Sequence, residues 1–277
     1  MSILTERFEL TAGQDLIVRG RVSMSRQEGA VRRPVLIICH GFKAFAGWGF
    51  FPYTADWFAE RGFYTVLFDF SCNGVRDRDF DELDKFALNT YSREQKDLAL
   101  VMDALRQGKL PHASSADSAK LHLLGHSRGG GNAIIFAAEH SAVCSIAVWN
   151  SIASPQLLGE AAADEAKQAG VTYIENARTK QQMPISYTFF KDIEDHLERF
   201  AIARRLSELA QPALLIQGDQ DSSQLVDGYR QLQLAAPQHK YRTIAGGTHT
   251  FGAVHPFQGT TLQLEQALDA TFAFFKE

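Results

Sequence analysis

Short apolar runs alternate with longer segments of helical spacing along most of the chain. Continuous apolar runs such as RPVLIICH (33–40) and FYTVLFDF (63–70) predict strands that are buried on both faces. Segments such as YTADWFAERG (53–62) have the apolar spacing of a helix and end at a glycine. The same criteria predict further strands over 119–126, 142–150, 213–218 and 240–246, and further helices over 92–108, 130–140, 225–236 and 260–276.

The opening segment, 7–24, alternates apolar and polar residues and predicts a hairpin that turns at Gly13, Gln14 and Asp15. The helix over 92–108 is expected to begin with a capping box, Ser92 with Gln95, and to stop at Gly108. Alternating buried strands and helices favour an α/β fold. We therefore expect a mostly parallel central sheet of about eight strands, helices on both faces and the hairpin as an antiparallel edge.

Residues 151–205 interrupt the alternation with a helical pattern, a hairpin-like stretch and a polar-aromatic stretch. We interpret 1–277 as a single domain and 151–205 as a small lid inserted within it, over one end of the sheet. The aromatic and apolar residues of this insertion either line a substrate pocket or pack the insertion onto the body. They are Tyr173, Met183, Tyr187, Phe189 and Phe190.

The stretch GHSRG (125–129) lies between a predicted strand and a predicted helix. That context is typical of a nucleophile elbow, in which the serine is held in an unfavourable backbone conformation. The strand and helix approach so closely there that side chains at 125 and 129 would collide, so glycine is required. The Ser127 hydroxyl would then be exposed at the positive end of a helix. A glycine-rich turn with an incidental serine is the alternative.

A serine nucleophile needs a base, and the base needs a carboxylate that orients it. The histidine His249 follows the last predicted strand, 28 residues after Asp221, in the order Ser–Asp–His expected with such an elbow. We expect Asp221 to be the acid, because Asp219 directly follows its strand and is placed to bond local backbone N–H groups. His255 is the competing base, although it lies farther from the strand end.

An acyl-transfer site also needs N–H donors for the oxyanion. One donor is expected from the residue after the nucleophile, Arg128. The other is expected from the loop that begins HGFK (40–43), where we choose Phe42. Trp48, later in that loop, is expected to be part of the substrate pocket wall.

These residues give the sequence a resemblance to the α/β-hydrolase superfamily. The matching stretches are HGF (40–42), GHSRGG (125–130), GDQD (218–221) and GGTHTF (246–251). More narrowly, the chain looks like serine esterases and dienelactone-hydrolase-like or acyl-aminopeptidase-like hydrolases, and it is similar to the cinnamoyl and feruloyl esterase branch. That resemblance implies hydrolysis of carboxylic esters through an acyl-enzyme, without a metal or organic cofactor.

The resemblance has one departure, because Arg128 stands where glutamine or methionine is frequent; its backbone N–H still serves, but its side chain bears on substrate preference. Dienelactone hydrolases proper use a cysteine nucleophile, whereas position 127 is serine. An acyl-peptidase, a thioesterase, a lactonase or a C–C hydrolase with the same triad stays open as an alternative. So does a non-catalytic protein that keeps the fold as a ligand cup.

Composition limits the partners. The chain has 277 residues, is 45% hydrophobic and 22% charged, and carries a formal net charge of -4. That charge gives no footprint for nucleic acid or for an anionic membrane. The resemblance implies a small-molecule ester as the partner. The oligomeric state, monomer or homodimer, is left open.

Cysteine usage and the first residues favour the cytoplasm. Cys39, Cys72 and Cys144 are odd in number and far apart, so we expect no disulfide framework. Charges at Glu6 and Arg7 stand where a signal peptide needs an apolar stretch, and no run is long enough to span a bilayer. The acidic stretch RDRDFDELD (76–84) lacks the spacing of a calcium loop, so no metal site is expected.

Overall fold

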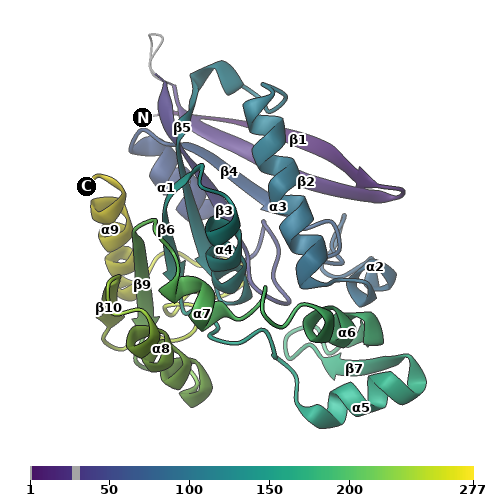
Figure 1. The fold of residues 1–277 in the computed structure, drawn as a ribbon. Coiled ribbons are helices and arrows are strands. Elements are labelled where there is room, and N and C mark those ends of the chain that lie inside the picture. The colour runs from purple at the N-terminus through teal and green to yellow at the C-terminus, as the bar shows by residue number, and fades with distance from the viewer. Residues whose placement is uncertain (1, 27–31) are drawn as a thin grey trace.

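The structure is a computed structural model that describes residues 2–26 and 32–277 (Figure 1). Within those residues, eight strands form one sheet in the order β1-β2-β4-β3-β5-β6-β9-β10. The strands are β1 (Ile3–Gly13), β2 (Leu16–Ser25), β3 (Arg33–Cys39), β4 (Tyr64–Asp69), β5 (Ala116–His126), β6 (Val143–Trp149), β9 (Ala213–Gly218) and β10 (Lys240–Ile244).

The sheet is parallel from β4 to β10, while β1 and β2 pair antiparallel with each other and β2 pairs antiparallel with β4. The opening hairpin is therefore the antiparallel edge that the alternating pattern predicts, and it turns on Gln14 and Asp15. The predicted fold class, a mostly parallel sheet of about eight strands with helices on both faces, is confirmed.

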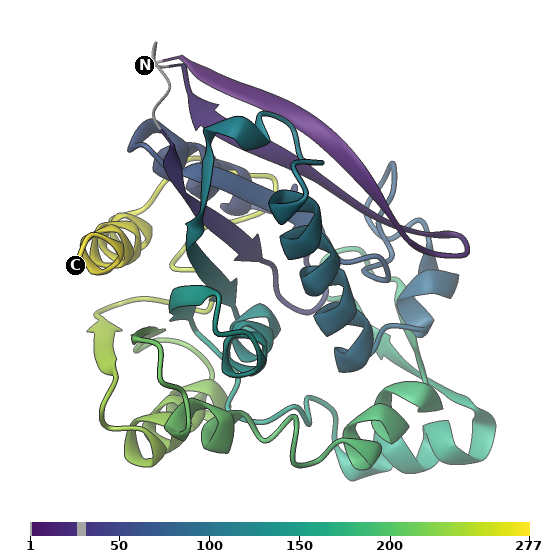
Figure 2. The same ribbon diagram turned by 45° about the horizontal axis from the view of Figure 1, so that its top comes forward.

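Helices cover the two faces of the sheet and bury separate cores (Figures 1 and 2). In β3, Val35 and Ile37 point into the core under α3, α4 and α8, whereas Leu36 and Ile38 point into the core under α1 and α9. The bounds of these helices are α1 (Phe51–Glu60), α3 (Tyr91–Arg106), α4 (Arg128–Glu139), α8 (Ser223–Ala235) and α9 (Leu262–Phe275). In the described ranges no helix has both the length and the apolar character for crossing a bilayer.

The expected capping box of α3 is wrong. The helix begins one residue earlier, at Tyr91, and its N-cap is Thr90, whose hydroxyl accepts a hydrogen bond from the Arg93 N–H at 3.1 Å. Ser92 lies inside the first turn, where its N–H and hydroxyl both donate to the Asp192 carboxylate. Ser92 is thus hydrogen-bonded to Asp192, which is distant in the sequence, and Thr90 serves as the N-cap in its place.

Four helical elements were not predicted from the sequence. They are α2 (Leu83–Ala87), a 3-10 turn at Ala113–Ser115, α6 (Tyr187–Asp195) and α7 (Ile202–Ser207). All three cysteines are free, as expected; Cys39 and Cys72 are buried and Cys144 is exposed.

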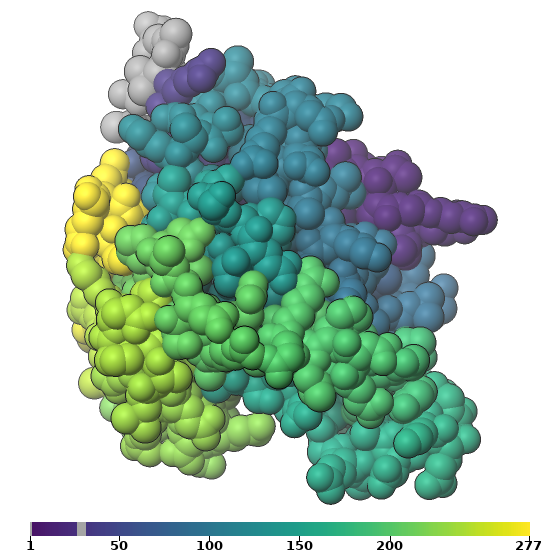
Figure 3. All heavy atoms as spheres, viewed as in Figure 1, coloured from purple at the N-terminus to yellow at the C-terminus, as the bar shows by residue number. Residues whose placement is uncertain are grey.

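Residues 151–205 form elements that stand apart from the central sheet. They contain α5 (Glu160–Ala169), a separate antiparallel pair of β7 (Val171–Glu175) and β8 (Gln182–Ser186), and α6 (Tyr187–Asp195). The last helix, α7 (Ile202–Ser207), begins inside this range and ends just beyond it. Figure 3 shows α5, β7 and α6 as a lobe at the lower right of the molecule. We refer to residues 151–205 as the insertion.

His122 on β5 gives the fold an acid-dependent stability. Burial, with a smaller contribution from the Lys120 cation, lowers the pKa of His122 from 6.5 to about 4. In the unfolded chain the imidazole regains a pKa of about 6.5, so at lower pH the unfolded state binds the proton more readily. The stability that the neutral imidazole contributes is therefore present above about pH 6.5 and is lost as the pH falls toward about 4.

We expect the free energy of unfolding of the wild type to fall by about 2 kcal/mol more than that of His122→Gln between about pH 8 and about pH 5. The hydrogen bond between Nδ1 and the Ser145 hydroxyl, 2.8 Å long, is a contact that the glutamine amide can replace. Urea unfolding followed by circular dichroism at both pH values measures the difference. Equal losses in the two proteins would show that His122 is not the titrating group.

Candidate active site

Ser127 occupies the sharp turn between β5 and α4. Its backbone has φ 56° and ψ -121°, a conformation that residues with a side chain rarely adopt. The residues on either side, His126 and Arg128, are buried, whereas Ser127 is partly exposed. The turn therefore presents a strained serine at the N-terminus of α4, as the GHSRG pattern predicts.

Glycines on both sides of the serine let the backbone segments touch. A Cβ at Gly125 would overlap the backbone of Gly129, and a Cβ at Gly129 would overlap the carbonyl oxygens of Cys39 and His40. At both positions backbone atoms leave no room for even a methyl group, so the sequence requirement for glycine has a direct steric cause.

Gly129→Ser is expected to destabilise the fold by about 3 kcal/mol or more, because backbone rather than a flexible side chain must move. The matched control is Gly159→Ser at the N-cap of α5, where nothing lies within 4 Å of an added Cβ. Serine is a good N-cap, so we expect that variant to change stability by less than about 1 kcal/mol. Thermal and urea unfolding of both variants measure the contrast, and comparable stabilities would contradict the steric argument.

The carboxyl ends of β9 and β10 bring an acid and a histidine together. The Asp221 Oδ2 atom lies 2.9 Å from the His249 Nδ1 atom. The Asp221 side chain is 3% exposed and that of His249 is 38% exposed, so the carboxylate lies behind the imidazole. Burial alone raises the pKa of Asp221, but hydrogen bonds from His249, the Ser222 N–H and Gln217 outweigh it and hold that pKa below its usual value. The carboxylate is therefore ionised at neutral pH.

Backbone contacts join the two loops that carry this pair. Gly218 at the end of β9 packs directly on Gly247, where a Cβ would overlap the Gly247 carbonyl. The Gln220 N–H donates to the same carbonyl at 2.8 Å. The acid turn and the histidine loop are thus held as one unit at the end of the sheet.

Two polar residues that the sequence analysis gave no role fix the His249 backbone. Its carbonyl accepts hydrogen bonds from His126 Nε2 at 2.7 Å and from Asn150 Nδ2 at 2.8 Å. Asn150 Oδ1 also accepts from the Gly218 N–H at 2.8 Å, so it links the acid strand to the histidine loop. Because His126 directly precedes Ser127, its bond also ties the histidine loop to the elbow.

His126 donates its hydrogen bond to the His249 carbonyl as a neutral imidazole. Burial, with repulsion from His249, lowers the pKa of His126 to about 3. The carbonyl partner places the hydrogen on Nε2. The two histidine rings have their centroids 4.7 Å apart. In the described part of the chain the Ser127 hydroxyl makes no hydrogen bond. Hydrogen bonds between a nucleophile and its base often form fully only when substrate binds.

Two backbone N–H groups beside Ser127 lack acceptors. Among the described residues, no hydrogen bond is made by the N–H of Arg128 or by that of Phe42. The loop that carries Phe42 lies against the elbow, because a Cβ on Gly41 would stand 3.0 Å from the Ser127 Cβ. The structure therefore places two free donors beside the serine, at the positions chosen from the sequence.

The competing acid and base are engaged elsewhere. Asp219 is exposed, and its Oδ1 accepts from the Gly246 N–H at 2.8 Å. Gly246 lies in the loop after β10, so this N–H belongs to the neighbouring loop and not, as the sequence analysis expected, to the loop of Asp219 itself. His255 Nδ1 accepts from the Gly49 N–H at 2.9 Å, and its Nε2 lies 3.5 Å from Asp79. Of the candidate acids and bases, Asp221 and His249 are therefore the two that the structure brings together.

The four residues chosen for substrate binding lie in different surroundings. Trp48 stacks on the His255 ring, with centroids 5.8 Å apart. Met183 is fully buried in the core, while Tyr173 is 56% exposed. The Tyr187 hydroxyl lies 3.4 Å from Glu194 on the same helix. Among the contacts of the described residues, none joins these four to Ser127, Asp221 or His249, so their role stays a prediction.

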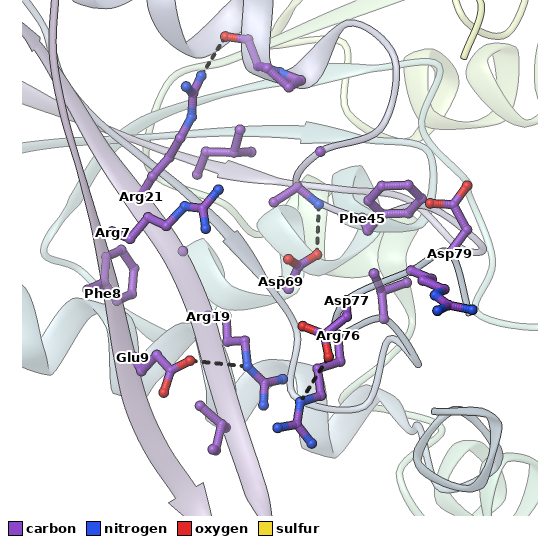
Figure 4. A pocket seen from close by; sticks show the side chains of 18 residues that line it. Arg7, Phe8, Glu9, Arg19, Arg21, Phe45, Asp69, Arg76, Asp77 and Asp79 are labelled. Atoms are coloured by element: carbon purple, nitrogen blue, oxygen red, sulfur yellow. Dashed lines mark hydrogen bonds and ion pairs between the residues drawn. The ribbon is translucent and has the colours of Figure 1, made fainter. Parts of the chain in front are cut away.

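A pocket of about 630 Å³ lies between the β1–β2 hairpin and the loops around 45–47 and 75–79 (Figure 4). Figure 4 shows Arg7 and Arg19 around it and Asp69 at the end of β4. Asp69 accepts from the Ala46 N–H at 2.7 Å. Neither Ser127, Asp221 nor His249 lines this pocket. Its size alone does not make it the reactive site, because no nucleophile and base meet there.

Solved structures match the chain over almost its full length. Est1E from Butyrivibrio proteoclasticus is 15% identical, with a TM-score of 0.70 over 98% of this chain and 97% of that chain. DcsB in complex with its substrate analogue is 18% identical, with a TM-score of 0.72 over 99% of each chain. The alpha/beta hydrolase GrgF from Penicillium sp. sh18 is 16% identical, with a TM-score of 0.70 over 99% of this chain and 98% of that chain.

The predicted resemblance to α/β hydrolases is thereby confirmed for the fold. No protein-family model and no curated protein matches the chain. At identities of 15 to 18% the three structures establish the architecture and leave the chemistry to the residues of this chain.

Proposed function

We propose that this α/β-hydrolase-fold chain is a serine hydrolase that cleaves carboxylic esters through an acyl-enzyme. Ser127 is the nucleophile, His249 the general base and Asp221 the acid that orients it. The observation that carries the proposal is the hydrogen-bonded Asp221–His249 pair, which His126 ties to the elbow that bears Ser127. The names of structural neighbours, which are hydrolases and an Est1E with bound ferulic acid, support an ester substrate.

Acylation begins when the Ser127 oxygen attacks the ester carbonyl carbon and His249 Nε2 takes the hydroxyl proton. Asp221 accepts from His249 Nδ1 and so keeps Nε2 free to act as the base. Its ionised carboxylate then stabilises the imidazolium. The carbonyl oxygen becomes an oxyanion, which the N–H groups of Phe42 and Arg128 bind.

The tetrahedral intermediate collapses by breaking the bond to the alcohol oxygen, and the imidazolium supplies the proton to the leaving alcohol. Water then attacks the acyl-enzyme while His249 takes its proton. The second collapse returns that proton to Ser127 and releases the acid. Every proton is held by His249 in turn, so these steps call for no metal or organic cofactor.

The insertion is proposed to act as a lid within a single domain, 1–277. Its support is contact with loops near the site: Lys43 Nζ, in the loop of Phe42, lies 3.4 Å from the Glu175 carbonyl on β7. The Gln181 side chain also donates to the Phe80 carbonyl at 3.1 Å. We propose Trp48, Tyr173, Met183 and Tyr187 as residues of the substrate pocket, and a cytoplasmic location on the basis of the free cysteines.

Labelling with a fluorophosphonate probe tests the nucleophile directly. We expect one equivalent of probe per chain, located on Ser127 by peptide mass spectrometry, and loss of labelling in His249→Ala. A panel of short-acyl, long-acyl and hydroxycinnamoyl esters, a lactone, an acyl-CoA and an acyl-amide then separates an esterase from a lactonase, thioesterase or peptidase. Absence of labelling on Ser127 in the folded protein would end the proposal and favour a ligand-binding role.

A further inference from the structure

The side chain that follows the nucleophile is a buried arginine with free donors. The Arg128 side chain is 1% exposed, and its Nε donates to the Glu94 Oε2 atom at 2.9 Å. Its Nη1 and Nη2 atoms are enclosed, and neither has a hydrogen-bond partner among the described residues. Buried guanidinium N–H groups are costly to leave unpaired, so they call for an acceptor from outside the chain.

Three aromatic rings from separate segments enclose this guanidinium. Its central carbon lies 4.3 Å from the Tyr91 ring on α3, 5.2 Å from the Phe189 ring on α6 and 5.5 Å from the Phe42 ring. Such contacts attract the cation but do not replace in-plane hydrogen bonds. Phe42 carries a proposed oxyanion donor and α6 belongs to the insertion, so the free donors lie beside the proposed reaction centre.

The charge of Arg128 is already balanced. Glu94 is 4% exposed, and its oxygens accept from Arg128, from Asn132 and from Asn89. Adding a carboxylate to this enclosed ion pair would leave a net negative charge without water. A neutral oxygen acceptor, such as a ketone carbonyl, pairs with the free N–H groups without that penalty.

We propose that Arg128 selects esters whose acyl chain carries a second, neutral carbonyl oxygen, which accepts from Nη1 and Nη2. This inference rests on the proposed function, because the ester is placed with its carbonyl carbon at Ser127. Phe42 is partly exposed, whereas Tyr91 and Phe189 are buried. Displacement of the Phe42 ring is therefore the route by which the substrate oxygen reaches the guanidinium.

The test compares matched ethyl esters by acid release: levulinate against valerate and acetoacetate against butyrate, with monoethyl succinate as the charged arm. We expect kcat/KM for at least one oxo ester to exceed that of its plain partner by about tenfold or more, the effect of one good hydrogen bond. For monoethyl succinate we expect no increase in kcat/KM over the plain esters. If an internal water bridges Arg128 to the free Asn89 or Gln95 oxygen, no oxo ester is preferred and the inference fails. Preference for succinate would also overturn it.

Variants then assign the preference to the guanidinium. Arg128→Lys keeps the charge beside Glu94 but loses the planar pair of donors, so the oxo-to-plain ratio should fall toward one. The matched control is Arg93→Lys, which alters the ion pair with Asp97, 2.9 Å long, within α3 itself. Its ratio should stay at the wild-type value. An unchanged ratio in Arg128→Lys would remove the side chain from substrate selection.

Binding to Ser127→Ala separates this inference from the proposed function. Ethyl levulinate and ethyl valerate are titrated into that variant by calorimetry, with no turnover required. A tenfold tighter oxo ester supports the Arg128 site even where the probe fails to label Ser127. Equal affinities in a protein whose Ser127 is labelled leave the hydrolase standing and refute the selection by Arg128.

Discussion

Ser127→Ala is expected to lower kcat for the preferred ester by about 10⁶-fold while the protein stays folded. The alanine removes only the oxygen that forms the acyl bond, and the enclosing turn, with its free N–H donors, is kept. Residual hydrolysis from those donors and from substrate binding should still exceed the uncatalysed rate by about 10³- to 10⁴-fold. Initial rates with the best ester of the panel measure both quantities.

The control is Ser154→Ala, which removes an exposed hydroxyl in the insertion that, among the described residues, accepts only from the Gln156 N–H. We expect its kcat to stay within about twofold of the wild type. Circular dichroism and the melting temperature establish that Ser127→Ala is folded. A loss smaller than about tenfold in that folded variant would mean that another group attacks the substrate.

Local sequence patterns predicted the parts of this molecule whose causes are local. A short apolar run such as 33–40 favours a strand covered on both faces, and β3 indeed divides its side chains between two cores. The glycines at 125 and 129 are explained by sterics within the elbow itself. Parallel strands bring their carboxyl ends to one edge of the sheet, which explains why Ser127, Asp221 and His249 lie at the same edge although they are far apart in the chain.

Long-range partners were not predictable in the same way. Nothing near His126 in the sequence shows that its imidazole bonds the backbone of residue 249, and nothing near Ser92 shows that Asp192 takes its hydroxyl. One feature of the sequence does point to the Arg128–Glu94 ion pair. Glu94 lies on the buried face of α3 together with Tyr91 and Leu98. A carboxylate on an apolar helix face calls for a buried cation, although its spacing does not say which one.

Asp221→Asn is expected to lower kcat/KM by about 10⁴-fold, the second largest effect. The asparagine can keep a hydrogen bond to His249 Nδ1, but its amide can also donate and so favour the tautomer in which Nε2 carries the hydrogen. The imidazolium formed during acylation would also lose the carboxylate beside it. Because Asp221 lies 2.9 Å from His249 and is 3% exposed, no solvent ion can take its place.

Asp219→Asn is the matched control, since it is the same substitution two residues away on the same turn. The new amide oxygen can still accept from the Gly246 N–H, so we expect kcat/KM within about threefold of the wild type. The contrast between the two variants decides which carboxylate serves His249. If Asp219→Asn instead lost most of its kcat/KM while Asp221→Asn stayed near the wild type, the assignment would be reversed. That result would mean that Asp219 is the carboxylate that orients His249.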